Sequence, residues 1–158
     1  MAWVLRLGIA LALASSISCA YFTLKLREPG HHNKSFPDEV AKEYHCDKRP
    51  LPFFRIEANE LVPRRVKPGS EFNHRLIYVL CPEHPTAVVP GTLRTRVLFE
   101  GRTIVEDSVQ QKLRPGRWVL DSFVAMPADV EPGLYAMDVR FWSSRGDLES
   151  QIDFIVKD

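Results

Sequence analysis

The stretch Gly116–Trp142, GRWVLDSFVAMPADVEPGLYAMDVRFW, carries the clearest structural pattern in the chain. Its first half alternates apolar side chains with Asp121, and its second half alternates apolar side chains with Asp138 and Arg140. The apolar positions are Trp118, Leu120 and Val124 in the first half and Tyr135, Met137, Val139 and Phe141 in the second. A period of two over this length predicts two half-buried β-strands.

A short bend, VEPGLY, joins these two strands over residues 130–135. Pro132 presets φ for the bend, and Gly133 can take a positive φ. Tyr135 follows immediately, so we expect a tyrosine corner, in which the hydroxyl group bonds to backbone a few residues upstream.

Five further runs of strand-like sequence surround this pair. They are Phe53–Glu60, Glu71–Cys81, Thr92–Phe99, Arg102–Val109 and Leu148–Val156. The second half of Glu71–Cys81 is apolar on both faces, as in a central strand that is covered on both sides. Turn sequences such as Glu100-Gly101 separate the runs. Seven short strands with regular turns predict an all-β, two-layer antiparallel sandwich.

The strand pattern and the VEPGLY bend resemble the broad immunoglobulin-like and fibronectin-like superfamily, over residues 53–156. The chain departs from antibody domains because the strand after the bend has no cysteine and the Thr92–Phe99 strand has no tryptophan. The resemblance is to fold only and implies an Ig-like β-sandwich. Bacterial exported domains of this architecture are often adhesive, accessory or inhibitory, but such an analogy assigns no site.

The N-terminal segment is hydrophobic and carries no charge between Leu7 and Leu24. Arg6, the short apolar core and the small residues that follow predict a secretory signal peptide. An uncleaved membrane anchor is a second possibility, because about 18 uncharged residues just span a bilayer. A lipoprotein signal with lipidation at Cys19 is the third. All three place the remainder outside the cytoplasm, in the periplasm or on the outer face of a membrane.

We expect three parts: residues 1–26 as signal peptide or anchor, 27–50 as a linker with a short helix, and 51–158 as the β-sandwich. Residues 27–34 (REPGHHNK) are polar and show no periodicity, which is typical of a spacer. Ser35 and Asp38 have capping-box spacing. The sequence therefore predicts a short helix there, with Val40 and Tyr44 on one side.

Two cysteines lie beyond the hydrophobic segment, Cys46 and Cys81. An even number in an exported chain predicts one disulfide, and two free buried thiols are the alternative. The bond would close a loop of about 35 residues and add on the order of 3–4 kcal/mol to the free energy of unfolding.

Composition and motifs argue against several functions. A net charge of +1 gives no electrostatic case for binding nucleic acid. The spacing of His31, His32, His45 and Cys46 matches no zinc pattern, so no metal or other cofactor is expected. No nucleophile motif is present, and His74 and His84 are interpreted as surface or partly buried residues. We therefore expect a protein that is not an enzyme; its oligomeric state is left open.

The most suggestive surface is the outward side of a predicted sheet built from Thr92–Phe99, the strand after the bend and Leu148–Val156. It carries Arg94, Arg96, Asp138, Arg140 and Trp142. A tryptophan beside arginines has the composition of a protein-binding hot spot. The alternative is that the arginines simply pair with neighbouring carboxylates, and that Trp142 packs under the next turn.

We therefore expect a non-catalytic module that binds another cell-envelope protein and contacts membrane only through its N-terminal segment. One alternative is a binder of carbohydrate or envelope polymer that stacks on Trp118 or Trp142. Another is an inhibitor of an exocytoplasmic enzyme that presents the loop from Cys81 to Pro90.

Overall fold

The computed structural model describes Arg27 and residues 29–158. The predicted signal peptide or anchor, with Cys19, lies outside the described residues. No helix within the described part of the chain is long and apolar enough to cross a membrane.

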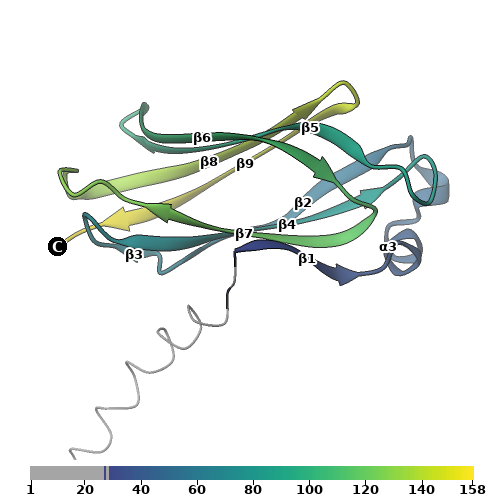
Figure 1. Ribbon diagram of the computed structural model, residues 1–158, viewed down its shortest axis with the longest axis horizontal. Coiled ribbons are helices and arrows are strands. Elements are labelled where there is room, and N and C mark those ends of the chain that lie inside the picture. The colour runs from purple at the N-terminus through teal and green to yellow at the C-terminus, as the bar shows by residue number, and fades with distance from the viewer. Residues whose placement is uncertain (1–26, 28) are drawn as a thin grey trace, which may run out of the picture.

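The described residues form two β-sheets that pack as two layers (Figure 1). The strands are β1 Gly30–Ser35, β2 Phe53–Val62, β3 Arg65–Val66, β4 Glu71–Cys81, β5 Val89–Phe99, β6 Arg102–Leu113, β7 Gly116–Ala125, β8 Gly133–Ser143 and β9 Gly146–Val156. All seven predicted strands are present, several of them longer than expected, so the all-β two-sheet prediction is confirmed.

The smaller sheet has the order β1-β7-β4-β2, and all of its pairings are antiparallel. β4 is central, as its apolar pattern predicts. The outer face of its C-terminal end is covered by the predicted helix, α3 (Pro37–Tyr44), whose Val40 is fully buried against Val79. An eight-residue helix is too short to be stable alone, so this packing holds it in place.

The larger sheet has the order β3-β9-β8-β5-β6. β8 lies between β9 and β5, so the three strands predicted to share a sheet do so. β3 pairs in parallel with the end of β9, and the other pairs in this sheet are antiparallel.

The interior between the sheets is filled by the inward positions of both layers. Met137, Val139 and Phe141 of β8 are almost fully buried there, as the period-two pattern predicts. Met126 and Met137 both belong to the main core cluster.

The tyrosine corner is present: the Tyr135 hydroxyl donates to the carbonyl oxygen of Glu131 at 2.7 Å. Gly133, however, does not take the positive φ expected of it. A Cβ at Gly133 would lie 2.7 Å from the ring of Phe99, which itself stacks on Tyr135 with ring centroids 4.4 Å apart. The glycine therefore makes room for an aromatic ring.

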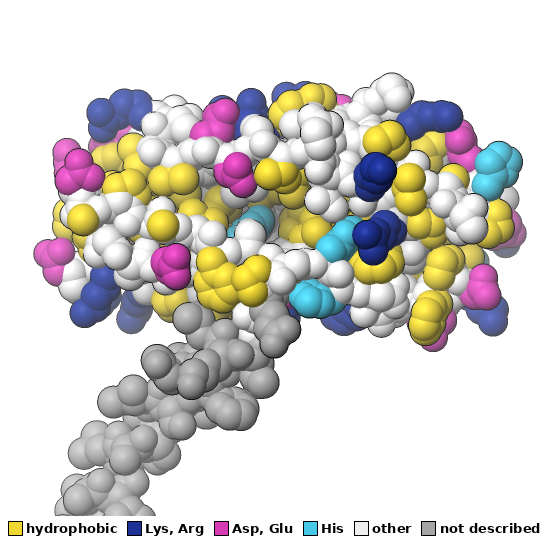
Figure 2. All heavy atoms as spheres, viewed as in Figure 1, with side chains coloured by type: hydrophobic (Ala, Val, Ile, Leu, Met, Phe, Trp, Pro, Cys, Tyr) yellow, Lys and Arg dark blue, Asp and Glu magenta, His cyan; other side chains and the backbone are white. Residues whose placement is uncertain are grey.

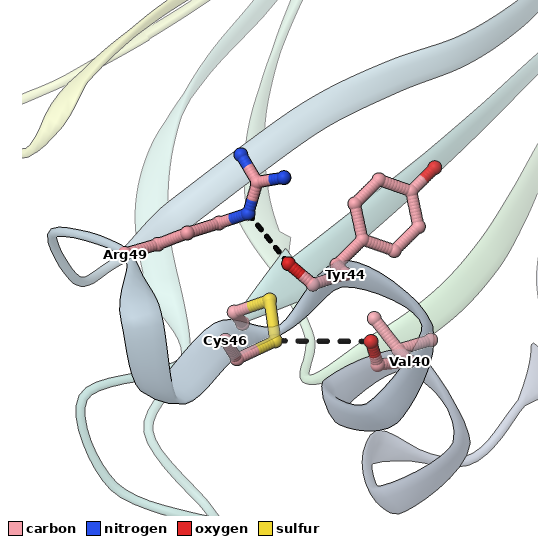
Figure 3. The surroundings of a disulfide bond; sticks show 5 residues. Val40, Tyr44, Cys46 and Arg49 are labelled. Carbon is pink, nitrogen blue, oxygen red and sulfur yellow. Dashed lines mark hydrogen bonds between the residues drawn. A yellow bond between two sulfur atoms is a disulfide. The ribbon is translucent and has the colours of Figure 1, made fainter.

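The disulfide between Cys46 and Cys81 is confirmed, with 5.7 Å between the two Cα atoms. Cys46 opens a short 3-10 turn, η1 (Cys46–Lys48), and Cys81 ends β4. Figure 3 shows Val40, Tyr44 and Arg49 around this bond, with Arg49 bonded to the Tyr44 carbonyl. The bridge fixes the helix and turn to the outer face of the smaller sheet, and it indicates an oxidising, exported compartment.

The interpretation of residues 27–34 as a spacer is wrong. Gly30–Ser35 is strand β1, which pairs with β7, and the Arg27 guanidinium bonds to Asn73 and Glu60 on the outer face of the smaller sheet. An edge strand needs only backbone pairing on one side, so it can form without apolar alternation. The helix also begins later than expected: Phe36, not Ser35, is its N-cap, and its backbone N–H donates to Glu39 at 3.3 Å.

Residues 54–59 alternate between apolar and polar side chains, which predicts one face for the apolar ones, but the second half of β2 does not follow that pattern. A β-bulge between Ile56 and Ala58 shifts the register. Beyond it, Asn59 and Leu61 face the interior, while Glu60 reaches Arg27 on the outer side. An extra residue in one strand reverses which side chains face the core beyond it, and the alternation of residue types does not predict where such a bulge occurs.

Candidate functional site

The five residues predicted to bind a partner lie on one outward face of the larger sheet. Arg94 and Arg96 are on β5, and Asp138, Arg140 and Trp142 are on β8. Arg94 is opposite Arg140 in the register, and Arg96 is opposite Asp138. Cross-strand neighbours on one face are within contact distance, so the strand pairing brings the set together.

Asp138 is the carboxylate that both β5 arginines of this face approach, and it is buried. Its side chain is only 5% exposed, and Arg96 donates two hydrogen bonds to its Oδ2 at 2.9 and 2.7 Å. Side chains at outward strand positions are usually solvated, but this outward carboxylate is shielded from water. The long guanidinium side chains of Arg94 and Arg96 lie over the shorter carboxylate and exclude water from it.

Among the described residues, no carboxylate pairs with Arg94 alone. Its nearest one is Asp138, at 4.0 Å, which is already engaged by Arg96. Its guanidinium carbon lies 5.7 Å from the centroid of the Trp142 ring, within the range of a cation–π contact. Arg140 differs, since its Nη2 donates to Asp147 at 2.7 Å.

Arg94, Arg140 and Trp142 line a pocket of about 270 Å³, together with Ser143 and Asp147; we call it the Trp142 pocket. The Nε atoms of both arginines are buried, and no other residue that the structure describes is hydrogen-bonded to them. The alternative that the arginines pair with neighbouring carboxylates describes Arg96 well, whereas Arg94 makes only a long ion pair, of 4.0 Å, with the same carboxylate. A pocket with a stacking ring and incompletely bonded guanidinium groups can take a carboxylate.

Trp118 is less suited to stack on a ligand. His31 lies on it with ring centroids 4.6 Å apart, and the Arg114 guanidinium lies 5.0 Å from its centroid. Its Nε1 donates to the Pro115 carbonyl at 2.8 Å. The surroundings of Trp118 are thus occupied by the protein itself.

The histidines considered as metal ligands have other roles or places. His31 bonds to the Tyr78 hydroxyl at 2.8 Å, and burial together with the charge of Arg114 lowers its pKa to about 4. Cys46 is in the disulfide, and His45 lies in the left-handed turn that ends α3. Within residues 29–158, no three potential ligands are placed to hold a metal ion.

A second pocket, which we call the edge groove, lies between the sheets where β6 and β7 face each other. It has a volume of about 330 Å³. Figure 2 shows hydrophobic side chains inside the hollow between the two layers. Its polar lining residues are Thr95, Asp107 and Ser122. Sequence reasoning did not single out this groove.

Behind Ser122, a chain of polar side chains crosses the interior. His74 Nδ1 lies 3.5 Å from the Ser122 hydroxyl, and its Nε2 lies 2.9 Å from Asn59 Oδ1. Asn59 in turn donates to Ser150 at 3.2 Å. The four residues come from β7, β4, β2 and β9, so only the fold brings them together. The sequence offered one signal of this cluster: Ser122 and His74 stand at positions where the alternation of their strands predicts an inward-facing apolar side chain.

The expectation that His74 lies at or near the surface is wrong, because it is 3% exposed. Burial lowers its pKa to about 4. Ser122, His74 and Asn59 follow the hydroxyl–imidazole–amide order of hydrolytic sites. A base of such low pKa is poorly matched to proton abstraction near neutral pH, so the arrangement favours hydrogen bonding. That the protein is not an enzyme stays a prediction.

No protein-family model matches this chain, and a search of curated proteins finds no match. Among solved structures, it is similar to the sporulation control protein Spo0M of Bacillus subtilis, with 14% identity and a TM-score of 0.45, over 66% of this chain and 49% of that one. It is also similar to the alkylpurine DNA glycosylase AlkC of Pseudomonas fluorescens, with 10% identity and a TM-score of 0.47, over 66% and 30%.

A third similar structure is a β-glucosidase of Listeria innocua, with 12% identity and a TM-score of 0.48, over 70% of this chain and 17% of that one. The chain thus spans about half or less of the structures it resembles. Likenesses this distant give no indication of function.

Proposed function

We propose that this chain is an exported, Ig-like β-sandwich module that binds another cell-envelope protein through the Trp142 pocket. The Ig-like assignment is supported by the two-layer arrangement, the parallel pairing of β3 with β9 and the corner at Tyr135. Export is supported by the Cys46–Cys81 disulfide. An N-terminal signal or anchor over residues 1–26 belongs to the same proposal.

The observation that carries the binding function is the state of Arg94. It shares one buried carboxylate with Arg96, and no hydrogen bond from another described residue engages its guanidinium group. Placed against the Trp142 ring, it offers a planar donor that matches a carboxylate. We infer that the partner presents an Asp or Glu side chain, or a C-terminal carboxylate, to this pocket.

The experiment is capture of partners by the tagged full-length protein, crosslinked in cells that export it. Arg94→Glu reverses the charge in the pocket, and we expect it to reduce recovery of a specific partner at least about tenfold, the scale of an interface hot spot. Arg55→Glu is the matched control, because Arg55 is an exposed arginine on β2 of the other sheet.

The proposal also requires reciprocity: replacing the partner's acidic residue by its amide must weaken binding to a similar extent. Equal recovery of the partner with wild type and with folded Arg94→Glu would overturn the assignment of this face. Recovery of glycan alone would favour the alternative of an envelope-polymer binder that stacks on Trp142. Inhibition through the loop from Cys81 to Pro90 stays a prediction.

A further inference from the structure

The edge groove exists because β1 covers only part of β7. Their pairing covers Arg117 to Asp121 of β7 and stops there because β1 begins at Gly30, the partner of Asp121. In the described part of the chain, residues 122–125 of β7 have a strand neighbour only on the β4 side. β6 is the outer strand of the opposite sheet. Two uncovered edges therefore face each other, and the space between them opens to solvent.

The walls of the groove are apolar. The larger sheet contributes Leu93, Val97, Val105 and Val109, and the smaller sheet contributes Phe123, Val124 and Ala125. Val109 is 43% exposed, which is unusual for an apolar side chain facing the interior of a sandwich. The volume, about 330 Å³, is within the range of sites for small molecules.

The hydrogen-bond chain behind the groove fixes what Ser122 can offer. The Asn59 amide group donates to Ser150, so its oxygen faces His74 Nε2. An amide oxygen only accepts, so Nε2 of the neutral imidazole carries the hydrogen and Nδ1 has the lone pair. The Ser122 hydroxyl then donates to Nδ1, and its oxygen is left as an acceptor toward the groove.

Asp107 adds a second acceptor. It is exposed at the groove, opposite Thr95 in the register, and no ion pair or hydrogen bond engages its carboxylate within the described residues. None of the residues that line the groove is basic. Apolar walls with a carboxylate and an acceptor hydroxyl are complementary to an apolar body that carries a positively charged donor.

We propose that the edge groove binds an alkylammonium group, with the alkyl part between the two sheets and the N–H donors on Asp107 and Ser122. This site is separate from the Trp142 pocket, which lies on the outward face of the larger sheet and would take a carboxylate. The chemistry is shared by free amines and by the lysine side chain of a protein.

The test is a titration of the full-length, ¹⁵N-labelled protein with n-hexylamine at neutral pH, followed by backbone amide chemical shifts. We expect saturable shifts at Val109 and Val124. 1-Hexanol, which has the same chain without charge, should bind at least about fivefold more weakly, and hexanoate more weakly still. Nα-acetyl-lysine N-methylamide is the probe for a lysine side chain. If it binds as tightly as hexylamine, the site is assigned to the lysine of a protein partner. If it binds markedly more weakly, the site is assigned to a free amine.

Two variants of β6 that each remove one negative charge test whether the Asp107 carboxylate itself binds the amine. Asp107→Asn should weaken hexylamine binding at least about fivefold and leave 1-hexanol binding unchanged. Glu106→Gln should change neither, because Glu106 lies on the opposite face of the strand. The proposal is overturned if hexanol or hexanoate binds as tightly as the amine, or if the two variants behave alike. It also fails if Asp107→Asn self-associates and still binds hexylamine normally. That result would mean that the inward charge of Asp107 prevents the edge strand β6 from pairing with another molecule and binds no ligand.

Discussion

Acid should destabilise this protein through His74. Burial lowers the pKa of His74 from 6.5 to about 4 in the folded state. In the unfolded chain the imidazole takes up a proton near pH 6.5. Between these values the unfolded state binds more protons than the folded state, so the free energy of unfolding falls as the pH falls. The contribution of His74 is fully present above about pH 6.5 and is lost progressively toward pH 4.

The size of the effect follows from the two pKa values. Complete loss would amount to about 3 kcal/mol, at 1.36 kcal/mol for each unit of pKa difference. Between pH 7 and pH 5 the loss is about 2 kcal/mol. His31 has a similarly lowered pKa and adds a loss of the same sign, so the decline of the wild type contains more than the His74 part.

The measurement is urea unfolding of the full-length protein at pH 7, 6 and 5, for the wild type, His74→Leu and His84→Leu. His74→Leu should be less stable at pH 7 by about 1–3 kcal/mol, because it leaves Asn59 and Ser122 without their buried partner. Its decline from pH 7 to pH 5 should be smaller than that of the wild type by about 2 kcal/mol.

His84 provides the control, since it is exposed in the loop after β4. His84→Leu should retain the full pH dependence of the wild type. If the wild type and His74→Leu lose the same free energy between pH 7 and pH 5, then His74 is not held neutral inside the sandwich. The hydrogen-bond reasoning for the edge groove would then fail as well.

Two further predictions concern stability. Tyr135→Phe removes the bond to the Glu131 carbonyl and should lower the free energy of unfolding by about 1 kcal/mol in chemical denaturation; an unchanged midpoint would mean that the corner bond contributes nothing net. Replacing both cysteines of the Cys46–Cys81 bond by serine should cost about 2–5 kcal/mol, and the wild type with reductant should lose a comparable amount. A reduced wild type as stable as the oxidised one would refute this.

Local pattern was sufficient for much of the fold. The alternation in residues 116–142 specified two half-buried strands, and the doubly apolar run in β4 specified its central position. The positions of Tyr135 and of the two cysteines beyond the hydrophobic segment predicted the corner bond and the disulfide. These features depend on the period of the strand and on the chemistry of single residue types, which are properties of short segments.

The sequence was sufficient to predict which residues lie on the proposed binding face, but not how their charges pair. Strand alternation places Arg94 and Arg140 on one outward face, since that requires only the period of two. Which guanidinium obtains the buried Asp138 depends on cross-strand register, and Arg96 lies directly opposite it. The incompletely paired state of Arg94 is therefore a result of tertiary structure.

The sequence by itself determined seven of the nine described strands, the disulfide and the residues of the outward face. Only the tertiary structure decided that the polar segment Gly30–Ser35 is a strand, because its pairing depends on the backbone edge that β7 presents. It also decided that Asn59 turns inward, through a bulge, and meets His74 and Ser122 inside the sandwich. Residues from separate strands converge there through packing and register, and no local pattern in any one strand encodes that meeting.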